Sequence, residues 1–491
     1  MFERIRSLFF RNVSARQTLV KNVVWLTVGQ FASRFIRAAI IIYAARVLGA
    51  GEYGVYSYAL GLAGFFTLFA DVGINSILTR ESAKKPEVAD QYFATSFVLK
   101  FFLLVVTALA VIFLAPLFSN IEGAKVILPF VALLTVFDNM REFCNAFFRA
   151  KERMEWEAIT TVVMNVAITV IGFFALSYAA TAKSLTISYV SSVGLGMAIG
   201  ILILRKQFSK LIADFDRSLM RPIIRAAWQI ALLGLLGVFM LNVDMVMLGW
   251  LKTSEDLGYY SAGQKIVQVL YTIPAILASA TFPLFSRLVA TGEKVHLKHV
   301  VEKTLEGTLL IAVPIAVGGI VLAESIIRFV YGNAYIPSVL TFQILLGTVL
   351  FIFPGIITGN LIFAYDQQRK ILKYTGLTSL GNVIFNVLLI PPLGIAGAAI
   401  ATLAMQIMYN NLTLRVAKSL LPIRIFPRLK SILVAGVIMG GVAYFLNRSH
   451  IHVLITIGVA SILYLGLLFL MRNRLIYEDA RHMMKKTFFV A

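Results

Sequence analysis

Two arginines stand in the middle of a long apolar segment of the chain. Arg34 and Arg37 are three residues apart, so they share one face of a helix, and Gln30 lies one turn earlier. An arginine at the centre of a bilayer costs about 2.5–3.5 kcal/mol on insertion scales. Because the planar guanidinium binds phosphate or carboxylate with two parallel hydrogen bonds, we expect these side chains to contact an anionic ligand.

Four further polar residues stand in apolar segments and belong to the same prediction. Lys265 and Gln268 are spaced to share a helical face, and we expect them to bind the ligand together with the arginines. Asp71 and Asp244 are candidates for ion coupling or charge pairing. The alternative is a purely structural set of buried salt bridges, with Asp71 paired to one of the two arginines and Asp244 paired to Lys265.

The remaining charges inside apolar segments have a structural interpretation. Lys100 is near one end of its segment, and we expect its long side chain to extend to the membrane surface. Asp138 and Arg141 are i, i+3 neighbours on a helix and Glu142 stands beside them, so the spacing predicts an ion pair.

The segments that must position these residues predict an all-α membrane protein. Hydrophobic residues make up 59% of the 491 residues, against about 45–50% in soluble domains, and the mean hydropathy is +0.85. A run of roughly 20 apolar residues crosses a bilayer. We predict fourteen transmembrane helices, at 22–43, 54–79, 90–114, 126–147, 156–178, 184–204, 222–250, 257–286, 304–323, 337–363, 371–390, 393–414, 430–446 and 452–471.

The positive charges agree with fourteen spans and two cytoplasmic termini. Of the 45 lysines and arginines, 34 fall in the segments then predicted to be cytoplasmic and six in the outer loops, which is a strong positive-inside asymmetry. The net charge of +21 is therefore explained by topology and by anionic membrane lipids, and it does not require nucleic acid. Residues 1–21 and 472–491 mix apolar and basic residues, as is typical of amphipathic segments at a membrane surface.

An internal repeat divides the predicted spans into two halves. "LGAGEYGVYSYA" at 48–59 recurs as "LGWLKTSEDLGYYSAG" at 248–263, where Gly54 and Gly258 correspond. A second pair of segments, 145–166 and 360–383, repeats in the same order. We predict two pseudo-symmetric six-helix lobes at 22–204 and 222–416, a cytoplasmic linker at 205–221, and two additional helices at 428–471. Equal numbers of spans give both lobes the same orientation, as in some transporters.

Signals for other chemistry are missing from the sequence. The chain has no G-x-x-x-x-G-K-[ST] motif for a nucleotide, and its five histidines fall in loops or the tail without ligand spacing, so we expect neither a cofactor nor a metal. The single cysteine, Cys144, excludes an internal disulfide. The predicted outer loops are short, which leaves no room for the extramembrane domain of a glycan polymerase or transferase. We therefore expect a transporter and not an enzyme.

The segment "AARVLGAGEYGVYSYALGLAGFFTLFADVGINSILTRESAK" at 44–84 carries a family resemblance. It resembles the N-terminal signature of the polysaccharide flippases, the Wzx-type members of the multidrug/oligosaccharidyl-lipid/polysaccharide (MOP) exporter superfamily. The pattern LG…YG.Y…D.G…RE.A is present at Leu48, Gly49, Tyr53, Gly54, Tyr56, Asp71, Gly73, Arg80, Glu81 and Ala83. The match in length and helix count covers essentially the whole chain.

The resemblance implies a V-shaped, MATE-like pair of lobes and a transport function. An isoprenoid-(pyro)phosphate-linked oligosaccharide would pass from the cytoplasmic to the outer leaflet of the cell membrane by alternating access, for cell-surface polysaccharide assembly. The family's cationic cavity implies that Arg34, Arg37 and Lys265 hold the headgroup. Implied partners are the isoprenoid-linked glycan, membrane lipids and glycan polymerase or assembly proteins. The alternatives are a lipid-II-type flippase and a cation-coupled MATE-like exporter of small molecules.

Overall fold

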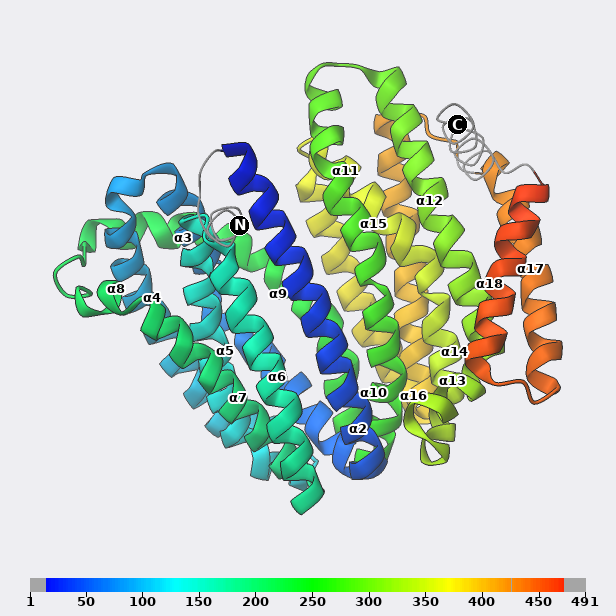
Figure 1. Cartoon of the computed structure of the whole chain (residues 1–491), viewed down its shortest axis with the longest axis horizontal. Coiled ribbons are helices and arrows are strands. Elements are labelled where there is room, and N and C mark those ends of the chain that lie inside the picture. The colour runs from blue at the N-terminus through cyan, green and yellow to red at the C-terminus, as the bar shows by residue number, and fades with distance from the viewer. Residues whose placement is uncertain (1–14, 425, 472–491) are drawn as a thin grey trace, which may run out of the picture. The chain divides into compact units, whose positions relative to one another are not determined.

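The computed structural model describes residues 15–424 and 426–471, and all of its regular elements in that part of the chain are helices (Figure 1). The amphipathic segment predicted at 1–21 and the tail at 472–491 lie largely or wholly outside the described residues. The chain divides into two compact units, Met1–Gly258 and Tyr259–Ala491. Each unit is described by itself below.

The first unit is built from long helices that pack side by side. They are α2 (Ala15–Asp71), α3 (Ile74–Lys84), α4 (Ala89–Leu109), α5 (Glu122–Ala150), α6 (Met154–Tyr178), α7 (Ala182–Ile203), α8 (Arg205–Ser209) and α9 (Met220–Leu251). Helix α4 continues through a π turn at Ala110–Leu114 and a 3-10 turn at Ala115–Phe118, because Pro116 cannot continue the α-helical hydrogen bonds. Helices α5, α6 and α7 pack on one another, and α2 packs along α6 and α9.

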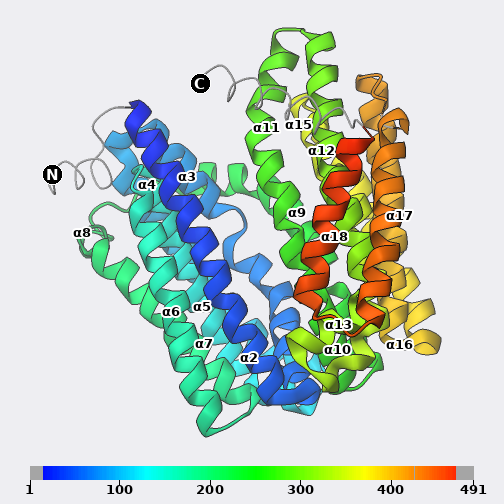
Figure 2. The ribbon, with the colours of Figure 1, turned by 45° about the vertical axis from the view of Figure 1, so that its right-hand side comes forward.

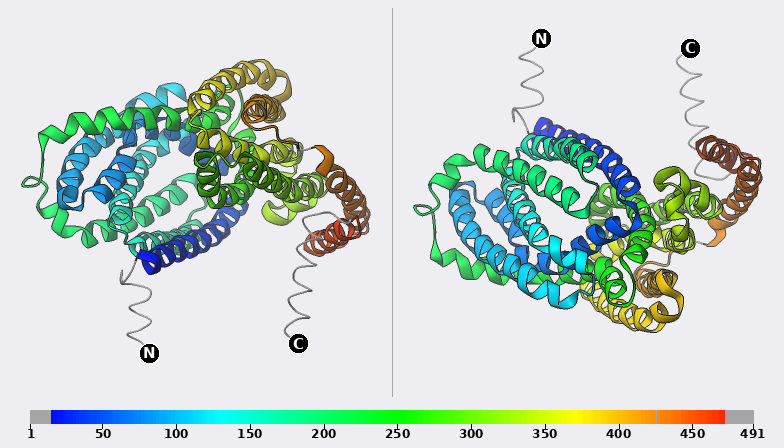
Figure 3. Two further views of the ribbon diagram at one scale, coloured as in Figure 1. Left: turned by 90° about the horizontal axis from the view of Figure 1, so that it is seen from above. Right: turned by 90° about the horizontal axis from the view of Figure 1, so that it is seen from below.

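The second unit repeats this all-helical plan. It contains most of α10 (Ser254–Leu270), then α11 (Thr272–Ala290), α12 (Lys294–Val321), α13 (Ala323–Tyr331), α14 (Val339–Gly347), α15 (Val349–Ala364), α16 (Gln368–Leu420), α17 (Phe426–Arg448) and α18 (Val453–Leu470). Helices α17 and α18 run side by side at the edge of this unit (Figures 2 and 3). Helix α17 packs on α12, and the Tyr464 hydroxyl of α18 donates to the Leu310 carbonyl oxygen of α12 at 3.0 Å.

Glycines divide the two longest helices where the sequence predicts a turn between spans. Helix α2 has 57 residues and breaks at Gly49, whose φ of 68° suits a residue without a Cβ. Helix α16 has 53 residues and breaks at Gly394, with φ of 60°, just after Pro391 and Pro392. Each of these helices therefore holds two of the predicted spans.

The length and apolar composition of the helices agree with a membrane protein. The number of fourteen transmembrane helices remains a prediction. Within the described residues, eleven helical stretches are long and apolar enough to cross a membrane. The fourteen predicted spans fall mainly on helical chain, with turns inside the spans at 54–79, 257–286 and 337–363, and the spans at 371–390 and 393–414 share α16. Helix α9, which the predicted division assigns to the second lobe, packs on α2, α3 and α4 in the first unit. The lobe boundaries predicted at 204–222 and 416–428 likewise remain predictions.

The repeated glycines of the sequence meet at one close helix crossing in the first unit. A Cβ on Gly54 would overlap the Ser254 carbonyl oxygen, and a Cβ on Gly258 would overlap the Ala50 carbonyl oxygen. The two helix backbones can approach this closely only because both positions lack a side chain. The motif that reveals the repeat in the sequence is thus also a packing motif.

Candidate functional site

Arg37 of α2 is held by a neutral amide. Its Nε donates to Asn165 Oδ1 of α6 at 2.9 Å, and the Asn165 amide nitrogen donates in turn to the Thr161 carbonyl oxygen at 2.7 Å. The Arg37 side chain is exposed, and no described carboxylate lies within 4 Å of it. Because Asn165 occupies only Nε, both terminal nitrogens of the guanidinium are available to a planar anion.

The other predicted ligands on α2 are placed only as backbone. Arg34 and Gln30 belong to the same helix as Arg37, about one and two turns before it, and their side chains lie outside what the structure describes. Lys265 and Gln268 are half-buried on α10, in the second unit. The structure therefore leaves the five-residue binding site as a prediction, with Arg37 described in detail.

Asp71 forms an ion pair with Lys100, a partner that the sequence analysis did not assign to it. Lys100 Nζ of α4 lies 2.7 Å from Asp71 Oδ1 and 3.3 Å from Asn139 Oδ1 of α5. The Lys100 side chain is 0% exposed, so the prediction that it extends to the membrane surface is wrong. A pair between Asp71 and Arg37 is also not formed, since Arg37 contacts Asn165 instead. Packing of α4 against the end of α2 buries the lysine, which sequence position alone does not show.

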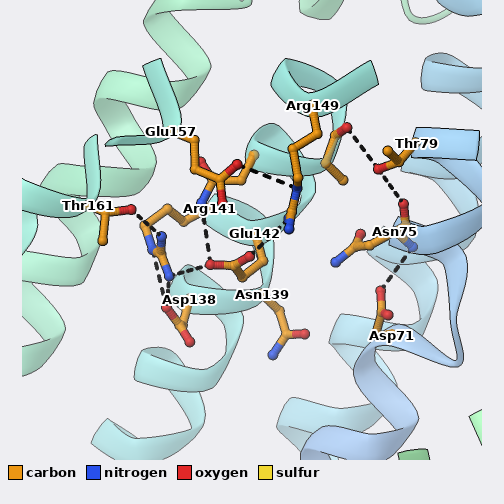
Figure 4. Close-up of polar contacts among 12 residues, drawn as sticks. Asp71, Asn75, Thr79, Asp138, Asn139, Arg141, Glu142, Arg149, Glu157 and Thr161 are labelled. Atoms are coloured by element: carbon orange, nitrogen blue, oxygen red, sulfur yellow. Dashed lines mark hydrogen bonds and ion pairs between the residues drawn. The ribbon is translucent and has the colours of Figure 1, made fainter. Parts of the chain in front are cut away.

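Asp71 stands at a break in the chain. Val72 has φ of 45° and Gly73 has φ of 81°, so α2 ends at Asp71 and α3 starts at Ile74. Asp71 Oδ1 also accepts a hydrogen bond from the Asn75 backbone N–H at 3.3 Å, as drawn in Figure 4. One carboxylate therefore neutralises a buried lysine and accepts a hydrogen bond from a backbone N–H in the first turn of α3, which has no partner within that helix.

A second cluster of charged residues lies along α5. Arg141 contacts Asp138 at 2.8 Å and Glu142 at 2.6 Å, which confirms the ion pair predicted from spacing. Arg149 joins Glu142 at 3.3 Å to Glu157 of α6 at 3.5 Å (Figure 4). Sequence reasoning missed the last two residues, although a glutamate at the start of the predicted span 156–178 is a signal of its own. The cluster holds three carboxylates and two guanidinium groups, and the contact of Arg149 with both Glu142 and Glu157 joins α5 to α6.

Asp244 is buried on α9, with 2% of its surface exposed. It is thus placed inside the first unit, while its role in ion coupling or charge pairing stays a prediction. Within residues 15–424 and 426–471, no group of three or more His, Cys, Asp and Glu residues is arranged to hold a metal ion.

The second unit carries an apolar groove of about 470 Å³. Helices α10, α12, α14, α17 and α18 line it, with Pro314 and Gly318 on one wall and Ala460, Ser461 and Tyr464 on another. Nearly all of its lining atoms are apolar, so the groove suits a hydrocarbon chain.

Comparison with known proteins defines the class to which this fold belongs. The chain superposes on the lipid II flippase MurJ in its inward closed conformation with a TM-score of 0.73, at 18% sequence identity, over 92% of this chain and 100% of that one. The likeness shows that the two chains share a fold.

The family follows from the sequence comparisons. The model for the polysaccharide biosynthesis protein family matches residues 19–289, and the MatE model matches residues 229–389. The chain is 21% identical over 443 residues to Agl15 of Haloferax volcanii, named as a probable low-salt glycan biosynthesis flippase, covering 90% of this chain and 92% of that protein. It is also 21% identical to the capsular polysaccharide biosynthesis protein CapF of Staphylococcus aureus, over 78% of this chain and 95% of that protein. The chain belongs to the polysaccharide biosynthesis protein family.

Proposed function

We propose that this protein is a flippase for an isoprenoid-(pyro)phosphate-linked oligosaccharide. It moves the lipid-linked glycan from the cytoplasmic to the outer leaflet of the cell membrane by alternating access, for cell-surface polysaccharide assembly. Family membership and the similarity to Agl15 and CapF support the substrate class. The termini lie in the cytoplasm in this proposal, in agreement with the distribution of basic residues.

The observation that carries the proposal is the environment of Arg37. Three buried basic side chains of the first unit contact carboxylates: Lys21 contacts Glu155, Lys100 contacts Asp71 and Arg141 contacts Asp138. Arg37 instead has a neutral amide that fixes Nε and leaves its terminal nitrogens for a ligand. Two oxygen atoms of a pyrophosphate match the planar guanidinium group in geometry and in charge.

The further residues of the proposed site follow from the sequence. Arg34, Gln30, Lys265 and Gln268 would extend the contacts to the pyrophosphate or to the glycan. Asp244 would serve in ion coupling or charge pairing. In this proposal Asp71 is the partner of buried Lys100 and, like Asp244, a candidate for ion coupling.

The apolar groove of the second unit supports the lipid part of the proposed substrate. An isoprenoid chain is a long hydrocarbon with no polar group to satisfy, and the lining of the groove offers almost no polar surface. The glycan, by contrast, needs hydrogen-bonding side chains such as the proposed glutamines. A glycan polymerase or assembly protein would receive the product at the outer leaflet.

Two alternatives remain within the same fold. A lipid-II-type flippase would use the same kind of headgroup, and the MurJ fold does not distinguish the two. The MatE match over residues 229–389 favours, as a second candidate, a cation-coupled exporter of small molecules. A cationic site opposes export of cationic drugs, because like charges repel.

A flipping assay in liposomes tests the proposal. Purified protein is reconstituted with a fluorescent isoprenoid-pyrophosphate oligosaccharide, and movement between leaflets is followed by loss of accessibility to a quencher or enzyme. We expect flipping by the wild type and a loss of roughly tenfold or more in Arg37→Gln, with little change in Arg80→Gln, whose arginine is exposed and already paired with Glu81. Transport of a small cation without any flipping would favour the exporter.

A further inference from the structure

A second apolar groove, of about 520 Å³, lies in the first unit, apart from the proposed substrate site. Helix α4 supplies Val98, Leu99, Phe102 and Leu103 to its wall, and α9 supplies Met220, Ile224 and Ala227. Val72 and Ile74 close it at the break between α2 and α3. Phe102 is 67% exposed and Ile224 is 53% exposed, so the groove opens outward from the helices.

Basic residues are concentrated in the chain segments that adjoin this groove. Arg221 and Arg225 alternate with the lining residues on the first turns of α9, and Arg217 lies three residues before Met220 in a 3-10 turn. Arg205 and Lys206 are on α8, which is fixed to α4 by the Phe208 ring against Phe93 and Phe97 at 5.2 and 5.4 Å. A short connection that carries Lys210 joins the two regions.

These charges are not compensated within the described part of the chain. Arg205, Lys206, Lys210, Arg217, Arg221 and Arg225 are all exposed, and none of the six lies within 4 Å of a described carboxylate. Two acids stand in the same segment, Asp214 and Asp216, and the six basic residues outnumber them. The Asp216 carboxylate accepts from the Ser218 N–H at 2.8 Å. Hydrogen bonding by Ser218 lowers the pKa of Asp216, which keeps that carboxylate ionised and directed to its own backbone.

We propose that this groove binds an anionic phospholipid. One acyl chain lies between α4 and α9, and the phosphate headgroup contacts the arginines at the start of α9. An apolar wall that ends in uncompensated guanidinium groups matches an amphiphile with one negative end, whereas a zwitterionic lipid adds a positive charge that these arginines repel. The predicted cytoplasmic location of residues 205–221 places the site in the inner leaflet, where anionic lipids are found.

The position of the groove gives the lipid a structural role. Val72 and Ile74 flank Gly73, and Val72 follows directly after Asp71, the partner of buried Lys100. An acyl chain packed against this break would contact Val72, which is half-buried, and Ile74, which is buried, at the point where one helix ends and the next begins. The bound lipid therefore supports the segment that positions the ion pair.

Native mass spectrometry of the full chain in detergent tests this proposal without any transport assay. The protein is exposed to dioleoyl phosphatidylglycerol or dioleoyl phosphatidylcholine, and retained lipid is counted. We expect the wild type to retain the phosphatidylglycerol at least about tenfold better, and we expect the triple variant R217Q/R221Q/R225Q to lose that preference. The matched control removes three lysines from the start of α12 in the second unit, K294Q/K298Q/K303Q, and keeps the preference.

Variants of the apolar wall test the acyl-chain half of the site. Val98→Trp fills the groove from a side chain that is 40% exposed and should lower phosphatidylglycerol retention, whereas Val105→Trp on the same helix, 42% exposed and outside the groove, should not. Glycerol phosphate at the lipid's concentration should not displace it. Equal retention of the two lipids by the wild type, equal loss in both triple variants, or displacement by glycerol phosphate would overturn the proposal.

Discussion

Replacing either member of the Asp71–Lys100 pair should destabilise the first unit, but by unequal amounts. The Lys100 side chain is fully buried, while 32% of the Asp71 side chain is exposed. Removing one partner of a buried ion pair costs most when the remaining charge has no access to water. The substitution that leaves the lysine charged and unpaired should therefore be the more harmful one.

The magnitudes follow from these exposures. Asp71→Asn leaves a buried ammonium with only amide oxygens as partners, and we expect a loss of about 3 kcal/mol in the free energy of unfolding, at the lower end for such pairs. Lys100→Met leaves a partly solvated carboxylate that still accepts from the Asn75 N–H, and should cost about 1 kcal/mol. The double variant leaves no charge to desolvate, so it should recover most of the Asp71→Asn loss.

Thermal stability of the purified protein in detergent, followed by the fraction that stays monodisperse after heating, measures this order. Asp90→Asn is the matched control, because Asp90 is half exposed and lies 3.8 Å from Lys151 at the surface. It should change stability by less than about 0.5 kcal/mol. A double variant less stable than Asp71→Asn, or a larger loss for Lys100→Met than for Asp71→Asn, would refute the reasoning.

Three further predictions concern the ligand, the helix crossing and the groove. Arg37→Lys keeps the charge but loses the planar fork, so flipping should fall roughly tenfold, and Asn165→Leu should lower it in the same direction by releasing the Arg37 Nε. Gly54→Ala should abolish the monodisperse protein, because its Cβ would overlap the Ser254 carbonyl oxygen. Gly49→Ala has open space around it and should cost about 1–3 kcal/mol, the strain of a non-glycine residue at φ of 68° and ψ of 175°; size-exclusion profiles compare the two. Ser461→Phe should block flipping of a long isoprenoid substrate while sparing a short-chain analogue, because the ring fills the groove of the second unit.

Local spacing along the helix predicted part of the site correctly. The Asp138–Arg141 contact follows from an i, i+3 separation, which any α-helix brings together. Such contacts depend on a few neighbouring residues, so a single sequence contains them. The glycine breaks at 49 and 394 were not predicted, although Gly49 lies between the predicted spans 22–43 and 54–79.

Pairings between helices could not be predicted with the same success. Lys100 and Asp71 are 29 residues apart, and only the packing of α4 against α2 and α5 shows that the lysine points inward. Arg149 lies just outside the predicted span 126–147, so the sequence places it in a loop. In the structure it contacts Glu142 of α5 and Glu157 of α6. In each case the rotation of a helix about its own axis determines which partner a side chain contacts. The spacing of apolar residues does not determine that rotation when most faces of the helix are apolar.

The partners of the buried cations in the first unit differ from the partner of Arg37. Within the described part of the first unit, Lys21 contacts Glu155 at 3.0 Å, Lys100 contacts Asp71 and Arg141 contacts Asp138, so the fold readily supplies carboxylates to cations among its helices. At Arg37 the fold supplies an amide that orients the guanidinium without neutralising it. A carboxylate at the position of Asn165 would stabilise the arginine and would also compete with any anionic ligand. The neutral partner keeps the positive charge available, as binding and then releasing a pyrophosphate requires. Because the cell interior is negative, outward movement of each negative charge of the substrate is favoured by up to ~2.3 kcal/mol per 100 mV. The site therefore needs only to offset the desolvation of the headgroup as it crosses the membrane.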